Sequence, residues 1–179
     1  MQFQDIIQFW FQELTAKDHF SKSDRLDNTV RDRFGSTLLA ALRCELYTWR
    51  ATPLGRLAEI VVLDQFSRNI FRGQPQSFSQ DPQALTLAQE LVASGQDQAL
   101  DLTHRAFAYM PYMHSESLAI HEQAVPCFSQ PGLEGSLAFE LKHKEILHRF
   151  GRFPHRNAIL GRASTPDEQV FLSQPGSSF

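Results

Sequence analysis

The segment from Pro53 to Arg72 constrains the fold of this chain more than any other. Its apolar residues occupy nearly every side of the helix that they would form, so this helix needs other helices around it. Gly73 follows as a typical C-terminal stop. We therefore predict a central, buried helix over residues 53–72. Its apolar residues are Leu57, Ile60, Val61, Leu63, Phe66, Ile70 and Phe71.

The rest of the chain offers helices to surround the central one. Apolar residues recur every three or four positions, and no segment of useful length alternates as a strand does. The mostly short connections favour antiparallel neighbours. We therefore predict an all-α fold, with a single domain over 1–173 and a disordered tail over 174–179. The other expected helices span residues 3–14, 24–49, 81–94, 101–109, 114–128, 137–150, 154–160 and 166–172.

Composition and charge argue against several classes of protein. The chain has 179 residues, of which 42% are hydrophobic, and this suits the core of one domain. A net charge of −3 provides no overall basic field, so we expect no nucleic-acid partner. The N-terminus carries Asp5 and no basic region, unlike a signal peptide, and the longest purely apolar run, 60–63, is far shorter than a membrane span. We expect a cytoplasmic protein without a membrane partner.

Polar residues on one side of the central helix form the first candidate site. Their three- and four-residue spacing places them on a shared face. They could line a polar pocket that faces residues 149–162. Alternatively they form an internal network of ion pairs, because a buried charge without a partner is strongly destabilising. These residues are Asp64, Gln65, Arg68, Asn69 and Arg72.

The segment 149–162 concentrates cations beside apolar residues that favour burial. Arginine forks bind phosphate or carboxylate in a bidentate manner, so the segment suits a small anion. Alternatively its arginines pair with Asp64, Glu116 and Glu145 and only stabilise the fold. The candidate residues are Arg149, Arg152, His155, Arg156, Asn157 and Arg162.

The segment 114–116 adds His114 and Glu116 at the expected start of a helix, where the helix dipole favours a carboxylate. A histidine near a carboxylate can be tuned for proton transfer near neutral pH, so Glu116 with His114 or His155 is a candidate acid–base pair. The sequence has neither HExxH nor CxxC spacing, and we expect no metal site. It also lacks a glycine-rich phosphate loop, and we expect no cofactor.

Several motifs resemble one bacterial family. They are Leu63-Asp-Gln-Phe-Ser-Arg-Asn-Ile-Phe-Arg-Gly73, His114-Ser-Glu116, and Phe150-Gly-Arg-Phe-Pro-His-Arg-Asn157 followed by Leu160-Gly-Arg162. With Phe9-Trp-Phe11 and the ending 164–172, they resemble the "domain of unknown function 924" family over nearly the whole chain. Ser67 stands where that family would have proline. The resemblance implies a tetratricopeptide-like array of antiparallel helices and no established activity.

We favour a binding domain with an arginine-rich pocket for a small anion or for the acidic terminus of a protein partner. In this hypothesis the anion is held by Arg68, Arg72, Arg152 and Arg156. His155 and Asn157 orient it, while Asp64 and Glu116 position the arginines. One alternative is a hydrolase or lyase that uses the acid–base pair around Glu116 on an arginine-bound substrate. The other is a purely structural ion network, with the function on other surfaces.

Overall fold

A continuous run of helix from Pro53 to Ile70 forms the core of the first part of the chain. The computed structural model, which describes residues 1–177, divides this run into α4 (Pro53–Val61), the π-helical turn η3 (Val62–Phe66) and α5 (Ser67–Ile70). Every residue from Leu57 to Leu63 is fully buried. The prediction of a helix buried on all sides is therefore confirmed.

One buried carboxylate of this helical run was not predicted, because apolar residues surround it in the sequence. Glu59 of α4 is 0% exposed. Arg50, from the 3-10 turn η2 (Tyr47–Ala51), donates to both of its oxygens at 2.7 and 2.6 Å. This bidentate pair joins η2 to α4 and satisfies a charge that would otherwise be costly to bury.

Helices make up all the regular secondary structure of residues 1–177. Besides α4 and α5, the α-helices are α1 (Phe3–Gln8), α2 (Ala16–Phe20), α3 (Asp24–Leu42), α6 (Asp81–Ala93), α7 (Leu102–Met113), α8 (Leu118–Phe128), α9 (Glu134–Phe150) and α10 (Pro166–Leu172). The remaining short turns are η1 (Phe9–Glu13), which is π-helical, and the 3-10 turns η4 (Pro75–Ser77), η5 (Gln96–Ala99) and η6 (Pro154–Arg156). The all-α prediction is confirmed. In this part of the chain, no helix is both long and apolar enough to cross a membrane.

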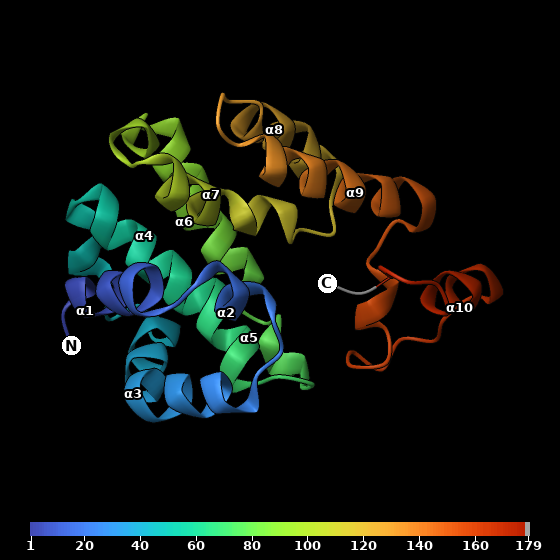
Figure 1. Cartoon of the computed structure of the whole chain (residues 1–179), viewed down its shortest axis with the longest axis horizontal. Coiled ribbons are helices and arrows are strands. Elements are labelled where there is room, and N and C mark those ends of the chain that lie inside the picture. The colour runs from blue at the N-terminus through green and yellow to red at the C-terminus, as the bar shows by residue number, and fades with distance from the viewer. Residues whose placement is uncertain (178–179) are drawn as a thin grey trace. The chain divides into compact units, whose positions relative to one another are not determined.

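The chain divides into two compact units. Unit 1 comprises Met1–Arg72 and Gln76–Pro111, and unit 2 comprises Gly73–Pro75 and the chain from Tyr112 onward. In unit 1, α3 packs against η3 and α5, while α1, η2 and α6 pack against α4 (Figure 1). Aromatic rings fill this core. The ring centroid of Phe34 lies 5.0 Å from that of Phe66 and 4.8 Å from that of Phe9.

Unit 2 is built on α8 and α9, which lie side by side and are joined by residues 129–133 (Figure 1). Gly151 ends α9 in the left-handed conformation, with φ of 69°. The chain then passes through η6, which contacts α10. The predicted single domain over 1–173 stays a prediction. Of the predicted tail over 174–179, residues 178 and 179 lie outside the described residues.

Several predicted helix boundaries are wrong. The helix expected over 24–49 ends at Leu42, because Cys44 adopts a left-handed φ of 58° that interrupts it. Residues 15–23, between two expected helices, contain α2, and the helix expected over 101–109 continues through Pro111 to Met113. The helix expected to start at His114 starts at Leu118. Before this helix, the carbonyl groups of residues 114 and 115 accept hydrogen bonds from side chains instead.

The close approach of α4 to η2 yields a test of the fold. A Cβ at Gly55 would lie 2.1 Å from the carbonyl oxygen of Trp49, whereas a Cβ at Gly35 in α3 would meet nothing within 4 Å. Gly35→Ala should therefore raise the free energy of unfolding by about 0.5–1 kcal/mol, through the lower entropy of the unfolded chain. Gly55→Ala should lower it by about 1–3 kcal/mol through overpacking. Urea denaturation measures both, and equal shifts in the two variants would contradict this packing.

Candidate functional site

The predicted polar residues of the central helix are held by carboxylates within unit 1. Arg68 makes a bidentate ion pair with Asp81 at 2.8 and 3.0 Å. The same guanidinium lies 3.1 Å from Asp64, which is buried and also accepts a hydrogen bond from Gln65. Two carboxylates therefore share Arg68, which leaves little of its charge for a ligand.

A second pairing joins α5 to α3. Asp27 is buried near the start of α3 and accepts hydrogen bonds from Asn69 at 2.8 Å and from Nε and Nη2 of Arg72. Burial opposes the charge of Asp27, but the bonds from Arg72 and Asn69 outweigh it and hold its pKa below the ordinary value. Neither Asp27 nor Asp81 was predicted as a partner, because each stands in the first turn of a helix, where an acidic residue needs no other explanation.

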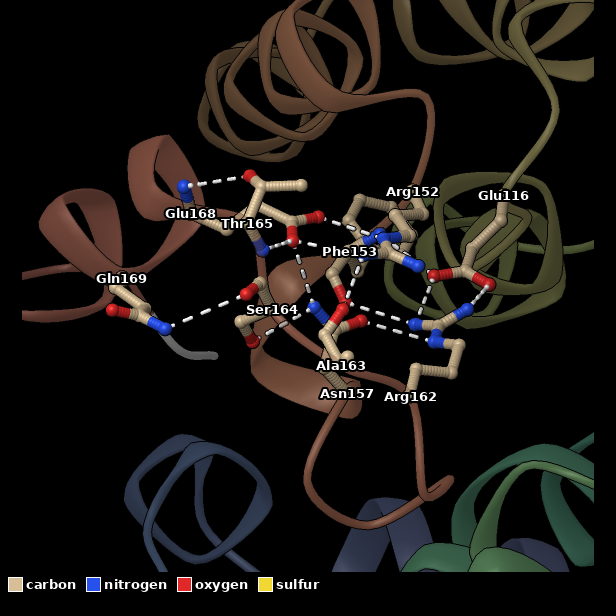
Figure 2. Close-up of polar contacts among 10 residues, drawn as sticks. All are labelled: Glu116, Arg152, Phe153, Asn157, Arg162, Ala163, Ser164, Thr165, Glu168 and Gln169. Atoms are coloured by element: carbon tan, nitrogen blue, oxygen red, sulfur yellow. Dashed lines mark hydrogen bonds and ion pairs between the residues drawn. The ribbon is translucent and has the colours of Figure 1, made fainter.

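In unit 2, Glu116 binds the predicted arginine segment (Figure 2). Its two oxygens accept from both terminal nitrogens of Arg162 at 2.7 and 2.9 Å, and one of them also accepts from the amide of Phe153 at 2.7 Å. Burial disfavours this carboxylate, but the hydrogen bonds from Arg162 and Phe153 prevail and lower the pKa of Glu116. Glu116 lies in the loop directly before the N-cap of α8, so the prediction that it stands at the start of the helix is wrong.

Glu168 binds two other residues of the segment 149–162, Arg152 and Asn157 (Figure 2). It is 2% exposed and accepts from Arg152 at 2.7 and 2.8 Å, from the amide of Thr165 at 2.7 Å and from Asn157 at 3.2 Å. The bonds from Arg152 contribute most to holding the pKa of Glu168 down at about 2, against the opposing effect of burial. Glu168 also stands in the first turn of α10, where an acidic residue needs no other explanation, so its pairing with Arg152 was not predicted.

Histidine rings and one arginine surround the buried side chain of Phe153. The rings of His121, His143 and His155 lie 5.6–6.3 Å from it between centroids, and the guanidinium of Arg156 lies 4.9 Å away. Arg156 is itself buried and donates to the carbonyl of His114 at 2.9 Å. These side chains therefore form part of the core of unit 2.

A fully buried pair, His121 and Glu140, fixes the loop before α8. The Nε2 of His121 donates to the carbonyl of Ser115 at 2.9 Å, and its Nδ1 lies 2.6 Å from Oε1 of Glu140. The loop that carries His114 and Glu116 is thereby joined to α9. Glu140 was not among the predicted site residues. Its place on the buried side of α9, in step with His143 and Leu147, is the signal that could have indicated one.

Unit 2 also carries a surface hollow of about 380 Å³ between the end of α9 and the start of α10. Arg149 lies at this hollow with its guanidinium 4.6 Å from the ring of Phe150 and 5.9 Å from that of Phe171. Arg149 is exposed and makes no hydrogen bond or ion pair within residues 1–177. The lining residues are Arg149, Phe150, Arg152, Thr165, Asp167 and Glu168.

The predicted site residues are thus placed in two sets, one in each unit. Unit 1 holds Asp64, Gln65, Arg68, Asn69 and Arg72, and unit 2 holds His114, Glu116, Arg149, Arg152, His155, Arg156, Asn157 and Arg162. Within each set, carboxylates and backbone carbonyls bind most of the arginines. That the two sets line one pocket stays a prediction. Of the proposed pairs with Glu116 and Glu145, the one with Glu116 forms, and Glu145 is exposed without an ion pair among the described residues.

Comparisons with known proteins agree with an all-helical protein of this architecture. A solved structure from Agrobacterium tumefaciens, of the protein of unknown function ATU0120, matches with a TM-score of 0.90 and 38% sequence identity, over 96% of each chain. None of the curated proteins matches. Residues 6–176 match the family described as "Bacterial protein of unknown function (DUF924)". The chain therefore belongs to the DUF924 family, as its motifs indicated.

The Arg152–Glu168 pair can be tested for its contribution to stability. Glu168→Gln keeps a side chain that can complete the helix cap but removes the charge, and the free energy of unfolding should fall by about 2–4 kcal/mol, because Arg152 loses its carboxylate. The contribution is present above the ordinary Glu pKa of 4.5 and is lost as the pH falls towards 2, since the folded protein holds the lower pKa. Glu145→Gln, on the exposed side of α9, should change stability by less than about 0.5 kcal/mol. Equal effects of the two substitutions in urea denaturation would contradict this role.

His143 predicts a second pH dependence. Burial, with a smaller contribution from repulsion by the neighbouring histidines, lowers the pKa of His143 from 6.5 to about 3, so the folded protein holds this ring neutral. The unfolded chain binds a proton there below pH 6.5, so stability is complete above that pH and falls by about 1.4 kcal/mol per unit as the pH drops towards 3. His143→Gln should remove this component. Urea denaturation from pH 7.5 to 4.5 measures it as the difference between the two proteins, and parallel curves would refute it.

Proposed function

We propose that this protein is a binding domain and that the hollow between α9 and α10 receives a carboxylate of its ligand, with Arg149 as the main contact. The observation that carries the proposal is the unpaired state of Arg149. It lines the hollow and is exposed, and no carboxylate within residues 1–177 neutralises it. A guanidinium that already rests on aromatic rings is well placed to accept a carboxylate on its free edges.

Arg152 supplies a second donor on the wall of the same hollow. Its Nε and one terminal nitrogen, Nη2, are engaged by Glu168, and Nη2 also donates to the carbonyl of Ala163. The other terminal nitrogen, Nη1, donates to no residue in the described part of the chain. Because Glu168 holds the guanidinium still, this nitrogen is preorganised and loses little entropy when a ligand binds.

The other arginines of the original hypothesis have structural partners. Arg68 and Arg72 meet buried or half-buried carboxylates in unit 1, and Arg156 donates to the carbonyl of His114 in unit 2. This distribution favours a structural role for most of the arginines and a ligand-binding role for the exposed Arg149. The proposal therefore joins two interpretations that the sequence had left as alternatives.

The geometry around Glu116 favours binding over acid–base catalysis. Both of its oxygens are occupied by Arg162 and the amide of Phe153, and its pKa is lowered rather than raised towards neutrality. A carboxyl group of this kind is a poor proton donor near pH 7. We accordingly propose a ligand-binding protein in the cytoplasm, with a carboxylate-bearing small molecule or peptide as its partner.

The proposal predicts a dependence on both the carboxylate and Arg149. As probes we choose the dipeptide alanyl-phenylalanine and its C-terminal amide, because an aromatic side chain suits the ring of Phe150. In NMR titrations the free acid should bind about 10-fold or more tightly than the amide, through charge-assisted hydrogen bonds. Arg149→Gln should abolish this difference. Arg25→Gln, which removes another exposed arginine, in α3, should preserve it. Equal affinity of acid and amide for the wild-type protein would rule out the proposal.

A further inference from the structure

The hollow that contains Arg149 is lined by two cations and two anions. Arg149 and Arg152 face it together with Asp167 and Glu168, so the formal charge of the lining is zero. A multivalent anion such as a phosphate or a dicarboxylate would meet two carboxylates there, and like charges in contact are unfavourable. The charge balance therefore disfavours the phosphate that the arginine segment suggested from sequence.

Only part of this charge is available to a ligand. Arg152 and Glu168 neutralise each other, and Glu168 has further donors in Thr165 and Asn157. Asp167, in contrast, is exposed and makes no ion pair or hydrogen bond within residues 1–177. The hollow thus presents one free cation, Arg149, and one free anion, Asp167, among the described residues that line it.

We infer that the ligand of this hollow is a small zwitterion, with a carboxylate that binds Arg149 and an ammonium group that binds Asp167. This inference rests on the proposed carboxylate site and adds the second charge of the ligand. The two side chains do not form an ion pair with each other, so a bound molecule can come between them. A volume of about 380 Å³ is at the small end of ligand pockets. Free amino acids and short peptides with unblocked ends share this chemistry.

The ring of Phe150 gives the hollow an apolar surface next to its cation. An apolar side chain on the zwitterion would cover this ring and remove both surfaces from water. Amino acids or peptides with an aromatic or large aliphatic residue should therefore bind better than those with a polar one. Because the two charges lie on exposed side chains, most of the selectivity comes from matching both at once.

The test adds a third ligand, N-acetyl-alanyl-phenylalanine, which keeps the carboxylate and lacks the ammonium group. Wild-type protein should bind it about 10-fold or more weakly than alanyl-phenylalanine, since a charged hydrogen bond is lost. Asp167→Asn should bind the free and the acetylated dipeptide equally. Thr165 and Glu168 still cap α10 in this variant, so it should fold, and a thermal melt checks this. Asp24→Asn, a matched change in the first turn of α3, should keep the wild-type preference.

The outcomes separate this inference from the proposed function. If the acetylated dipeptide binds wild type as well as the free one, while the amide binds weakly, the carboxylate site stands and the zwitterion is refuted. If the amide binds as well as the acid, the carboxylate site itself fails. If Asp167→Asn weakens the free and acetylated ligands equally, Asp167 only shapes the hollow and the inference is overturned.

A parallel titration with phenylalanine distinguishes the two sources of this chemistry. Tighter binding of phenylalanine than of alanyl-phenylalanine would assign the hollow to free amino acids. The ammonium and carboxylate groups of a single residue would then be the pair that fits Asp167 and Arg149. Tighter binding of the dipeptide would assign it to short peptides. Failure of both to bind wild-type protein at millimolar concentration would overturn the inference.

Discussion

A buried carboxylate needs a partner that neutralises its charge, and arginines do this within each of the two units. Glu59 and Asp27 in unit 1 and Glu168 in unit 2 are each 5% exposed or less, and each meets a bidentate guanidinium. Loss of one partner of a buried pair costs about 3–5 kcal/mol, against about 5–15 kcal/mol for the whole of a typical domain. Packing of the helices around α4 is therefore only part of what determines this fold.

These pairs also position segments that have no regular structure. Asp27 and Arg72 are 45 residues apart, and Glu116 and Arg162 are 46 apart, so each pair closes a long section of chain. In unit 2 the chain from η6 to α10 is mostly irregular, and its position is set by Glu116 and Glu168 rather than by a helix face. A carboxylate that accepts from several donors at once can replace the backbone hydrogen bonds that a helix would have supplied.

The helices could be predicted from the sequence because their signals are local. The spacing of apolar residues indicated α4, and Thr165, Pro166 and Glu168 are typical of a helix start at α10, where the structure forms a capping box. The partners of the arginines could not be predicted, because a pairing depends on which helices meet. Asp81 and Glu168 each stand in the first turn of a helix, where an acidic residue is common, so nothing in the sequence indicated their long-range contacts. The hollow was missed for the same reason, since Phe150, Thr165 and Asp167 come together only after α10 has been placed.

The contrast between paired and free charges distinguishes the proposed site from the structural ion pairs of this protein. Arg149 is in the last turn of α9 and Asp167 in the first turn of α10, where the helix dipole favours each by about 0.3–1 kcal/mol. Both are exposed, so water solvates them and neither needs a partner for the fold to be stable. Their charge is therefore available to a ligand at little cost, whereas Arg162 or Glu168 could reach a ligand only by breaking a pair. A ligand that satisfies both charges in one hollow gains most over one that satisfies a single charge.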